Sequence, residues 1–497
     1  MSYAPSELPN DVGNCQRCWF LKWWEFKLDR IASEAYAQLS RSHSRPSDPS
    51  GSRLSSDEAG GVTVNLIGDM PGDVPSVNRS RRHRIERVAL DPESVSDRDG
   101  LSTARSVALD AARLSERIGR LDIELFAPVG GKTMRAFSSA EVARLLEVPL
   151  SFLAHLERTE VGPNVERRMG RNWYTLAQIA ELRTIIGSVD KRSLPRPLPF
   201  ASWPTRNTAH EAVQVLAVAN FKGGSGKTTT TAHLVQYLAL RGYRTLAIDL
   251  DPQASLSSLL GHRPETDVGD AETLFGAIRY DNPRPMSDVV RQSYIHLLDL
   301  VPGNLELHEF EHETPRHLAS AKRGGAPFFA RIAEAIDAVA NDYDVIVLDC
   351  PPQLGFLTLG ALCAATGIIV TVHPQMLDIA SMNQFLNMTA DLMGVVEDAG
   401  ASPRLDFLRY LPTRFEPQDG PQTQVLAFMR SLFGERVMAN AVVKSAAVSD
   451  AGLSKQTLYE VPREAMDRRT YDRARVSVDA VNREIETLIR TAWGRAA

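Results

Sequence analysis

The stretch NFKGGSGKTTT, from Asn220 to Thr230, places two lysines around a glycine-rich turn. It follows the apolar run VQVLAVAN and precedes TTTTAHLVQYLAL, a segment with the character of a helix. A glycine-rich turn between a strand and a helix directs backbone N–H groups and the positive end of the helix to one point, where polyphosphates bind. The stretch therefore predicts a phosphate-binding loop within an α/β domain.

The loop matches the strict phosphate-loop pattern only at its end. Lys227 is placed to reach the β- and γ-phosphates, and the Thr228 hydroxyl is placed to join the shell of Mg²⁺. The strict pattern has a glycine five residues before Gly226, and Phe221 stands there instead. That pattern assigns no function to Lys222. The residues of the loop that it predicts to bind a nucleotide are Gly223, Gly224, Ser225, Gly226, Lys227, Thr228 and Thr229.

Three aspartates end two other apolar runs of the same part of the chain. Asp249 and Asp251 lie in LAIDLDPQAS, and Asp349 ends YDVIVLD. The carboxyl ends of the strands in an open parallel sheet converge on the ligand crevice, so the three aspartates and the loop are expected at one site. Asp349 has the position of the acidic group that a phosphate loop needs for its metal ion.

Beyond residue 210, apolar runs rich in β-branched residues alternate with segments of helical length. Nearly continuous hydrophobic strands separated by helices are typical of a parallel sheet covered on both faces. We therefore expect one α/β domain over residues 211–497. The predicted strands are VQVLAVAN, RTLAIDL, IHLLDLVPG, YDVIVLD, GIIVTVHP, DFLRYLP and RVMANAVV.

The remaining residues divide at changes of composition. Residues 1–104 become rich in Ser, Arg, Asp, Pro and Gly, which predicts a largely disordered extension. Residues 105–187 have apolar residues three and four apart, which predicts a small helical domain. Residues 188–210 contain several prolines and little periodicity, and we expect a linker there.

Overall composition indicates a globular protein of a reducing compartment. Of the 497 residues, 43% are hydrophobic and 24% charged, and the formal net charge is −5. Local basic patches, and not this sum, decide whether a protein binds nucleic acid. Four cysteines cannot form a disulfide framework in so long a chain. No apolar run has the length that spans a bilayer, so we expect a cytoplasmic protein without a membrane partner.

The helical domain has the pattern of a DNA-binding fold. FSSAEVARLLEVPLSFLAHLER predicts a helix capped by Ser138 or Ser139, a turn near Glu147, and a second helix. Arginines follow in GPNVERRMGRNWY, and the whole resembles a MerR-like winged helix-turn-helix, in which the second helix enters the major groove. A helical hairpin that only contacts other proteins is the alternative. The predicted DNA contacts are Ser151, His155, Arg167, Arg168 and Arg171.

Three further patterns suggest other sites. PVGGKT (128–133) also ends in Gly-Lys-Thr, but it follows an acidic helical stretch and not a buried strand. CQRC (15–18) needs two more ligands to hold zinc, which leaves an intermolecular zinc site open. Cys350 and Cys363 lie in apolar segments, where packing is expected in place of an iron–sulfur cluster.

Three stretches together identify a family. FKGGSGKTTT with its lysine before the paired glycines, DLDPQAS, and LDCPP resemble the deviant Walker A ATPases of the ParA, Soj and MinD group. Over residues 107–493 the chain is similar to the RepA-type partition ATPases of repABC plasmids, notably in LVPGNLELHEFEHETPR and DGPQTQVLAFMRSLFG. The similarity does not extend to the N-terminal extension.

This resemblance implies a function for Lys222. Two monomers of such an ATPase enclose two ATP molecules, and the signature lysine reaches the phosphates of the nucleotide in the other subunit. Asp251 would orient or activate the attacking water, and hydrolysis by positioning and electrostatics alone is expected to be slow. The implied catalytic residues are Lys222, Lys227 and Asp251, and the implied Mg²⁺ residues are Thr228, Asp249 and Asp349.

The resemblance also implies partners for an ATP-dependent homodimer. A ParB- or RepB-type centromere-binding protein would stimulate hydrolysis, and the dimer would coat nucleoid DNA without sequence preference. The helix-turn-helix would bind operator DNA and repress the protein's own operon. Basic residues late in the α/β domain are candidates for the nonspecific DNA contact, namely Arg414, Lys444, Lys455 and Arg463.

Two alternatives share these modules. A transcription regulator would use the nucleotide as a ligand without segregating DNA. A MinD-like positioning ATPase would end in a basic amphipathic helix, whereas SVDAVNREIETLIRTAWGRAA has a polar face of mixed charge. Its apolar stripe is expected to pack on the core of the domain; it consists of Val478, Val481, Ile485 and Ile489.

Overall fold

The computed structural model describes residues 103–125, 132–159, 162–168, 170–188, 204–320, 326–400 and 404–495. The CQRC stretch, nearly all of the predicted disordered extension and most of the predicted linker lie outside these residues. The chain divides into two compact units between Arg113 and Leu114, inside helix α2 (Thr103–Leu125). The second unit holds the sheet, the helices that cover it and the candidate site.

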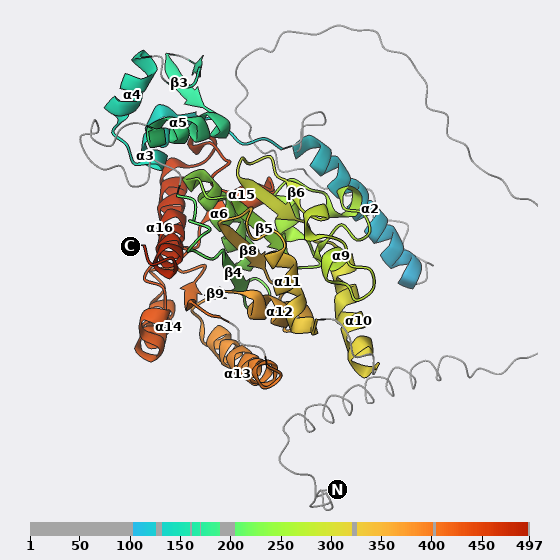
Figure 1. Cartoon of the computed structure of the whole chain (residues 1–497). Coiled ribbons are helices and arrows are strands. Elements are labelled where there is room, and N and C mark those ends of the chain that lie inside the picture. The colour runs from blue at the N-terminus through green and yellow to red at the C-terminus, as the bar shows by residue number, and fades with distance from the viewer. Residues whose placement is uncertain are drawn as a thin grey trace, which may run out of the picture. The chain divides into compact units, whose positions relative to one another are not determined.

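A seven-stranded sheet forms the centre of the second unit (Figure 1). Its order is β10-β9-β4-β8-β5-β7-β6, and every neighbouring pair is parallel except β6 with β7. The predicted parallel α/β sheet is therefore confirmed. The strands are β4 (Gln214–Ala219), β5 (Thr245–Asp249), β6 (Arg291–Gln292), β7 (Leu298–Val301), β8 (Val345–Asp349), β9 (Gly367–Val372) and β10 (Phe407–Pro412).

The predicted strand RVMANAVV is wrong. Its start belongs to the short 3-10 helix η6 (Gly434–Arg436), and the rest pairs only locally: Val437 bridges Tyr410 of β10, and Val443 bridges Phe415 beyond the end of β10. The Met438 N–H donates to Tyr410 O, which holds the segment beside β10 without a continuous ladder. The apolar residues that suggested a strand instead pack under β10 or line a cavity.

Helices cover both faces of the sheet. Leu216 and Val218 of β4 join a buried cluster with α6 and α16, whereas Val215 and Ala217 join a cluster with α9, α11 and α12. The helices of this part are α6 (Lys227–Arg241), α7 (Ser255–Leu259), α8 (Pro264–Asp267), α9 (Leu274–Ile278), α10 (His308–Ala319), α11 (Arg331–Asp337), α12 (Phe356–Ala364), α13 (Met376–Asp398), α14 (Gly420–Phe433), α15 (Ala446–Leu453) and α16 (Arg468–Ala492). Short 3-10 turns complete it: η3 (Met286–Asp288), η4 (Leu305–Leu307), η5 (Phe328–Ala330) and η7 (Arg463–Ala465).

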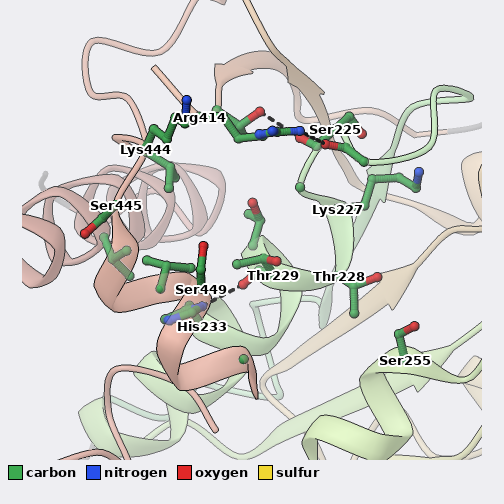
Figure 2. Close-up of a pocket in the computed structure, with 18 of the residues that line it drawn as sticks. Ser225, Lys227, Thr228, Thr229, His233, Ser255, Arg414, Lys444, Ser445 and Ser449 are labelled. Carbon is green, nitrogen blue, oxygen red and sulfur yellow. Dashed lines mark hydrogen bonds between the residues drawn. The ribbon is translucent and has the colours of Figure 1, made fainter. Parts of the chain in front are cut away.

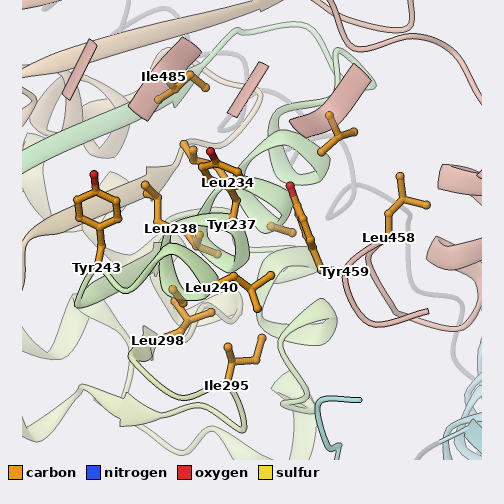
Figure 3. Close-up of a cluster of buried hydrophobic side chains, with 14 of the residues drawn as sticks. Leu234, Tyr237, Leu238, Leu240, Tyr243, Ile295, Leu298, Leu458, Tyr459 and Ile485 are labelled. Atoms are coloured by element: carbon orange, nitrogen blue, oxygen red, sulfur yellow. The ribbon is translucent and has the colours of Figure 1, made fainter. Parts of the chain in front are cut away.

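On one face of the sheet, a buried hydrophobic core holds α6 in place. Leu234 and Leu238 of α6 pack with Ile485 of α16 in one buried cluster (Figure 3). The predicted C-terminal stripe is confirmed as part of this core, because its four residues are all buried. Among the described residues, no helix combines the length and the apolar character that crossing a bilayer requires.

Residues 132–159, 162–168 and 170–188 form three helices and a small antiparallel sheet. Ser138 caps α3 (Ser139–Leu146) in a capping box with Glu141, and Glu147 ends it in the left-handed conformation (φ 53°). The predicted helix, turn and helix are therefore present. The second helix is α4 (Leu150–Arg158), followed by α5 (Leu176–Ser188), and the sheet has the order β1 (Phe137–Ser138), β3 (Arg171–Tyr174), β2 (Glu166–Arg168).

Buried polar contacts join these helices to α6. Arg241, in the last turn of α6, donates from Nη1 to Leu145 O (3.2 Å) and to Glu147 Oε1 (3.1 Å). The buried Arg183 of α5 donates from Nη2 to Leu240 O (2.9 Å). Because α6 begins at the glycine-rich loop, one rigid helix connects that loop to α3 and α5.

Candidate nucleotide-binding site

The glycine-rich loop lies between β4 and α6, as predicted. Gly224 and Gly226 have φ of 75° and 89°, in the left-handed region where glycine is favoured. Gly226 is also the N-cap of α6 and has no side-chain cap. The first N–H groups of the helix are therefore directed at the loop, which gives it the geometry of a phosphate cradle.

The ends of β9 and β10 hold the loop in this conformation. The Thr413 hydroxyl donates to Ser225 O (2.7 Å), and the Thr371 hydroxyl donates to Ser225 Oγ (3.0 Å). Arg414 approaches from the same edge and donates from Nη1 to Gly224 O (3.2 Å), as Figure 2 shows. These three bonds fix the backbone of the loop in the conformation that surrounds a phosphate.

Lys227 is buried beneath the loop. Its Nζ donates to Lys222 O (3.3 Å), so the ammonium lies under the backbone that would surround a phosphate. Burial lowers the pKa of Lys227, and the charge of Asp349 opposes that change. An anion in the cradle would compensate the buried ammonium.

Asp249 and Asp349 lie side by side at the ends of β5 and β8. Asp349 Oδ1 accepts a bond from Thr231 Oγ1 (3.1 Å), whereas its Oδ2 is buried without a hydrogen-bond partner. Burial raises the pKa of Asp349, the charge of Asp249 raises it further, and a bond from Thr228 lowers it. An orphaned oxygen in a pair of buried carboxylates next to a threonine hydroxyl fits a divalent cation.

Asp249 braces the loop that carries Asp251. Its Oδ2 accepts bonds from Ser257 N (2.8 Å) and Ser257 Oγ (2.7 Å), and its Oδ1 accepts one from Asp251 N (3.2 Å). Both oxygens of Asp249 are thus engaged by the protein. Asp251 itself is half-exposed, and its Oδ1 accepts a bond from Gln253 N (2.9 Å). Of the two, only Asp251 lines the cavity above the loop.

A cavity of about 570 Å³ extends from the loop and Asp251. One wall comes from residues that sequence analysis did not assign to the site: Val442, Val448 and Asn482, together with Ser449 and His233, which Figure 2 shows. Each is ordinary in its own segment, and only the packing of α6, α15 and α16 brings them together.

His233 is held neutral in this wall. Its Nδ1 lies 2.7 Å from Thr229 O, and Leu458 N donates to its Nε2 (3.2 Å). These two bonds place the proton on Nδ1, and burial lowers the pKa of the ring. This wall is therefore polar but uncharged at His233, in contrast to the phosphate cradle.

The described residues do not form a metal site made of protein ligands alone. No group of three or more His, Cys, Asp or Glu is arranged to hold a metal ion within the described ranges. Magnesium commonly binds through one or two carboxylates together with substrate phosphates, so this observation agrees with the Asp349 geometry. Burial raises the pKa of both the Cys350 and Cys363 thiols, which opposes cluster ligation by thiolates.

The predicted DNA contacts of the helical domain are all exposed. Ser151 and His155 lie on α4, and Arg171 lies on β3. Arg167 lies on β2, and Arg168 of the same strand donates two bonds to Glu166. The hairpin of β2 and β3 thus presents the arginines, although one of them is already paired within the hairpin.

Lys444 lies at the nucleotide cavity and not on the helical domain. It lines the cavity together with the loop, and its Nζ donates to Glu416 Oε1 (2.9 Å). Its predicted DNA contact stays a prediction. Arg463 is paired with Asp472 on the surface.

Comparison with known proteins places the chain in a family. A family model described as an AAA domain matches residues 213–397. The chain is 52% identical over 387 residues to the putative replication protein A of Rhizobium rhizogenes, which covers 78% of this chain and 94% of that protein. The chain belongs to the ParA-type partition ATPases of the RepA group. The resemblance carried by the loop, DLDPQAS and LDCPP is therefore confirmed.

Two further comparisons extend this result. The chain is 29% identical over 354 residues to the protein SopA of Escherichia coli K12, covering 69% of this chain and 84% of that protein. A solved structure named Partition Protein has a TM-score of 0.53 with 17% identity, and it covers 79% of this chain and all of that one. At that identity the structure shows the fold alone.

Proposed function

We propose that the protein is an ATPase that segregates a plasmid or secondary replicon, and that it acts as a dimer enclosing two ATP molecules. One observation carries the proposal. The orphaned oxygen of the buried Asp349 lies beside the phosphate cradle, which also carries a second lysine, Lys222, at its rim. A phosphate cradle with a metal position at Asp349 and the additional cation of Lys222 fits a nucleoside triphosphate that two subunits share.

The cavity offers separate places for the phosphates and the base of ATP. The loop and Lys227 would bind the phosphates, and the uncharged wall at His233, Val448 and Asn482 would receive the base. Thr228 and Asp349 would hold Mg²⁺, which when bound neutralises charge on the phosphates. Asp249 supports this arrangement from behind, because its oxygens are committed to the protein.

Asp251 is the residue that we assign to the attacking water. It lines the cavity on a loop fixed by Asp249, and within the described residues its Oδ2 accepts no hydrogen bond. A single carboxylate that orients water, without strong charge stabilisation of its own, gives slow turnover. Slow turnover suits a protein that remains in its ATP state until a partner accelerates hydrolysis.

Lys222 is proposed to reach the nucleotide of the other subunit. Its side chain is 41% exposed at the rim of the loop, whereas Lys227 is buried below it. We expect Lys222→Ala to keep nucleotide binding by the monomer while losing ATP-dependent dimerisation and hydrolysis. Sedimentation velocity with and without ATP tests this, and a variant that dimerises as well as the wild type would rule out the cross-subunit contact.

The helical domain is proposed to bind operator DNA. Helices α3 and α4 with the β2–β3 hairpin have the arrangement of a winged helix-turn-helix, with Ser151 and His155 on the second helix and the arginines on the wing. Autorepression and binding of nucleoid DNA belong to the same proposal. The same modules also suit a nucleotide-responsive regulator that does not segregate DNA.

Turnover measurements separate these two functions. ATP hydrolysis by the full chain is measured alone, with nonspecific DNA, and with a ParB- or RepB-type centromere-binding protein encoded beside it. A partition ATPase is expected to respond to the partner and to DNA together. Turnover that responds to neither would overturn the segregation function and leave the regulator as the explanation.

A further inference from the structure

Two adjacent residues of the loop, Phe221 and Lys222, both contact helix α13. The ring of Phe221 packs against Phe385, with centroids 5.8 Å apart. The ammonium of Lys222 forms an ion pair with Asp378 Oδ1, in the first turn of the same helix. The side chain of the signature lysine is therefore 41% exposed, while its ammonium is ion-paired within its own subunit.

Asp378 depends on this ion pair. Its side chain is only 7% exposed, and its Oδ2 is buried without a hydrogen-bond partner. Besides Lys222, His373 faces this carboxylate: its Nδ1 lies 3.6 Å from Asp378 Oδ2, and its Nε2 is also buried without a hydrogen-bond partner among the described residues. A second cavity of about 320 Å³ opens at this point, beside the phosphate cradle.

We propose that Asp378 is a positioning residue for Lys222: it retains the lysine within its own subunit until the nucleotide of a second subunit competes for it. This inference rests on the proposed cross-subunit function of Lys222. Departure of the lysine leaves a buried carboxylate without its counter-ion, which is strongly unfavourable. His373 is placed to take up a proton and to become the new counter-ion of Asp378.

The charges around His373 give the direction of the pH dependence. Asp378 and Glu416 face it as acids, and Arg414 and Lys222 face it as bases, with Lys444 on the same cavity wall. Burial lowers the pKa of His373 most, Asp378 raises it, and Arg414 and Lys222 lower it. Departure of Lys222 therefore raises the pKa of His373. The dimer, in which Lys222 has left, then binds more protons than two monomers do, so dimerisation is favoured as the pH falls through the pKa of His373.

Competition sets the size of the effect. If the ion pair with Asp378 reduces the fraction of free Lys222 about fivefold, the contribution of that subunit to the affinity for the second subunit falls by the same factor. A symmetric dimer releases two lysines, so the dimer dissociation constant carries the square of that factor. We expect Asp378→Asn to lower the dimer Kd about 25-fold in the presence of an ATP analogue that is not hydrolysed.

The experiment is sedimentation equilibrium of the full chain with Mg²⁺ and adenylyl-imidodiphosphate from about pH 6 to 8.5. Asp391→Asn, which removes an exposed acid of α13, is the matched control and is expected to behave like the wild type. Asp378→Glu keeps a carboxylate and is expected to restore retention. His373→Gln is expected to remove the part of the pH dependence that belongs to the protein.

Three outcomes bear on the inference. Tighter dimerisation of Asp378→Asn, with a weaker pH dependence in His373→Gln, supports it. An Asp378→Asn variant that is folded and dimerises no more tightly than the wild type overturns it, even when Lys222→Ala fails to dimerise. If Lys222→Ala dimerises normally, the proposed function fails first, whatever Asp378→Asn does. Thermal unfolding of each variant establishes that a loss of dimer is not a loss of fold.

Discussion

Substitution of Lys132 tests whether the stretch PVGGKT (128–133), which also ends in Gly-Lys-Thr, is structural or binds phosphate. Its ammonium pairs with Glu460 Oε1 (2.7 Å) and donates to Leu259 O and Lys455 O, both at 2.6 Å. The side chains of the pair are 7% and 1% exposed. Three short contacts engage the ammonium inside the protein, so it has no free donor to offer a phosphate.

Removal of this ammonium by Lys132→Met has a cost that the contacts allow us to work out. Breaking a buried ion pair from one side costs about 3–5 kcal/mol. Glu460 keeps bonds from Gln236 Nε2 (2.9 Å), Thr457 N (2.8 Å) and Tyr294 OH (2.7 Å), which places the loss at the lower end, about 3 kcal/mol. At ~2–4 °C per kcal/mol for a domain of this kind, Tm is expected to fall by about 6–12 °C.

Thermal unfolding and the affinity for a fluorescent ATP analogue, measured well below Tm, give the two readouts. Lys132→Met should lower Tm and keep the affinity, whereas Lys227→Met should lose the affinity. Thr133→Ala, an exposed change in the same stretch, is the control for both. A Lys132→Met variant with the Tm of the wild type and no nucleotide affinity would refute the structural assignment of this lysine.

The other predictions concern the carboxylates, the loop and the hairpin. Because burial raises the pKa of Asp349 to about 8, the nucleotide-free protein should lose stability as pH rises from about 4 to 8. In urea unfolding at pH 6 and pH 8, the free energy of unfolding of Asp349→Asn should therefore rise relative to that of the wild type at the higher pH. The variant should also lose the stabilisation that Mg²⁺ and ATP give the wild type. Gly226 has φ of 89°, and a Cβ added there would lie 3.5 Å from Thr413, so Gly226→Ala should lower the free energy of unfolding by about 1–3 kcal/mol and weaken nucleotide binding. Gly394→Ala on α13 is the control: its Cβ meets no neighbour within 4 Å, and neither quantity should change. Arg171→Ala should reduce by about one the slope of log affinity for DNA against log salt in fluorescence anisotropy; an unchanged slope would exclude a phosphate contact.

The parallel sheet could be predicted because its strands are buried on both faces. Each of the confirmed strands is a nearly continuous apolar run, a signal that lies within the strand itself. Strand β6, with only Arg291 and Gln292 at the edge, has no such signal. Residues 436–443 have the apolar signal without the strand, because burial under β10 and against the cavity selects the same residue types as a sheet does.

The candidate site could be predicted where one segment carries the geometry and not where several segments share it. The loop and the three aspartates each follow a strand, and the sheet topology brings strand ends together. The wall at His233 and Asn482 needs the packing of α6 against α16, which local sequence does not specify. Lys444 illustrates the same limit, since its basic character does not distinguish a cavity wall from a DNA-facing surface.

Phe221, which departs from the strict loop pattern, and the neighbouring signature lysine Lys222 are informative because both contact α13. A glycine in place of Phe221 would satisfy the pattern but would leave Phe385 without its ring contact, and an uncharged residue in place of Lys222 would leave Asp378 without a counter-ion. Asp378 and Phe385 lie two helical turns apart and so present one face of α13 to the loop. The position of Lys222 is thus set by α13 as much as by the loop, and a movement of α13 would change the reach of the lysine without changing the phosphate cradle.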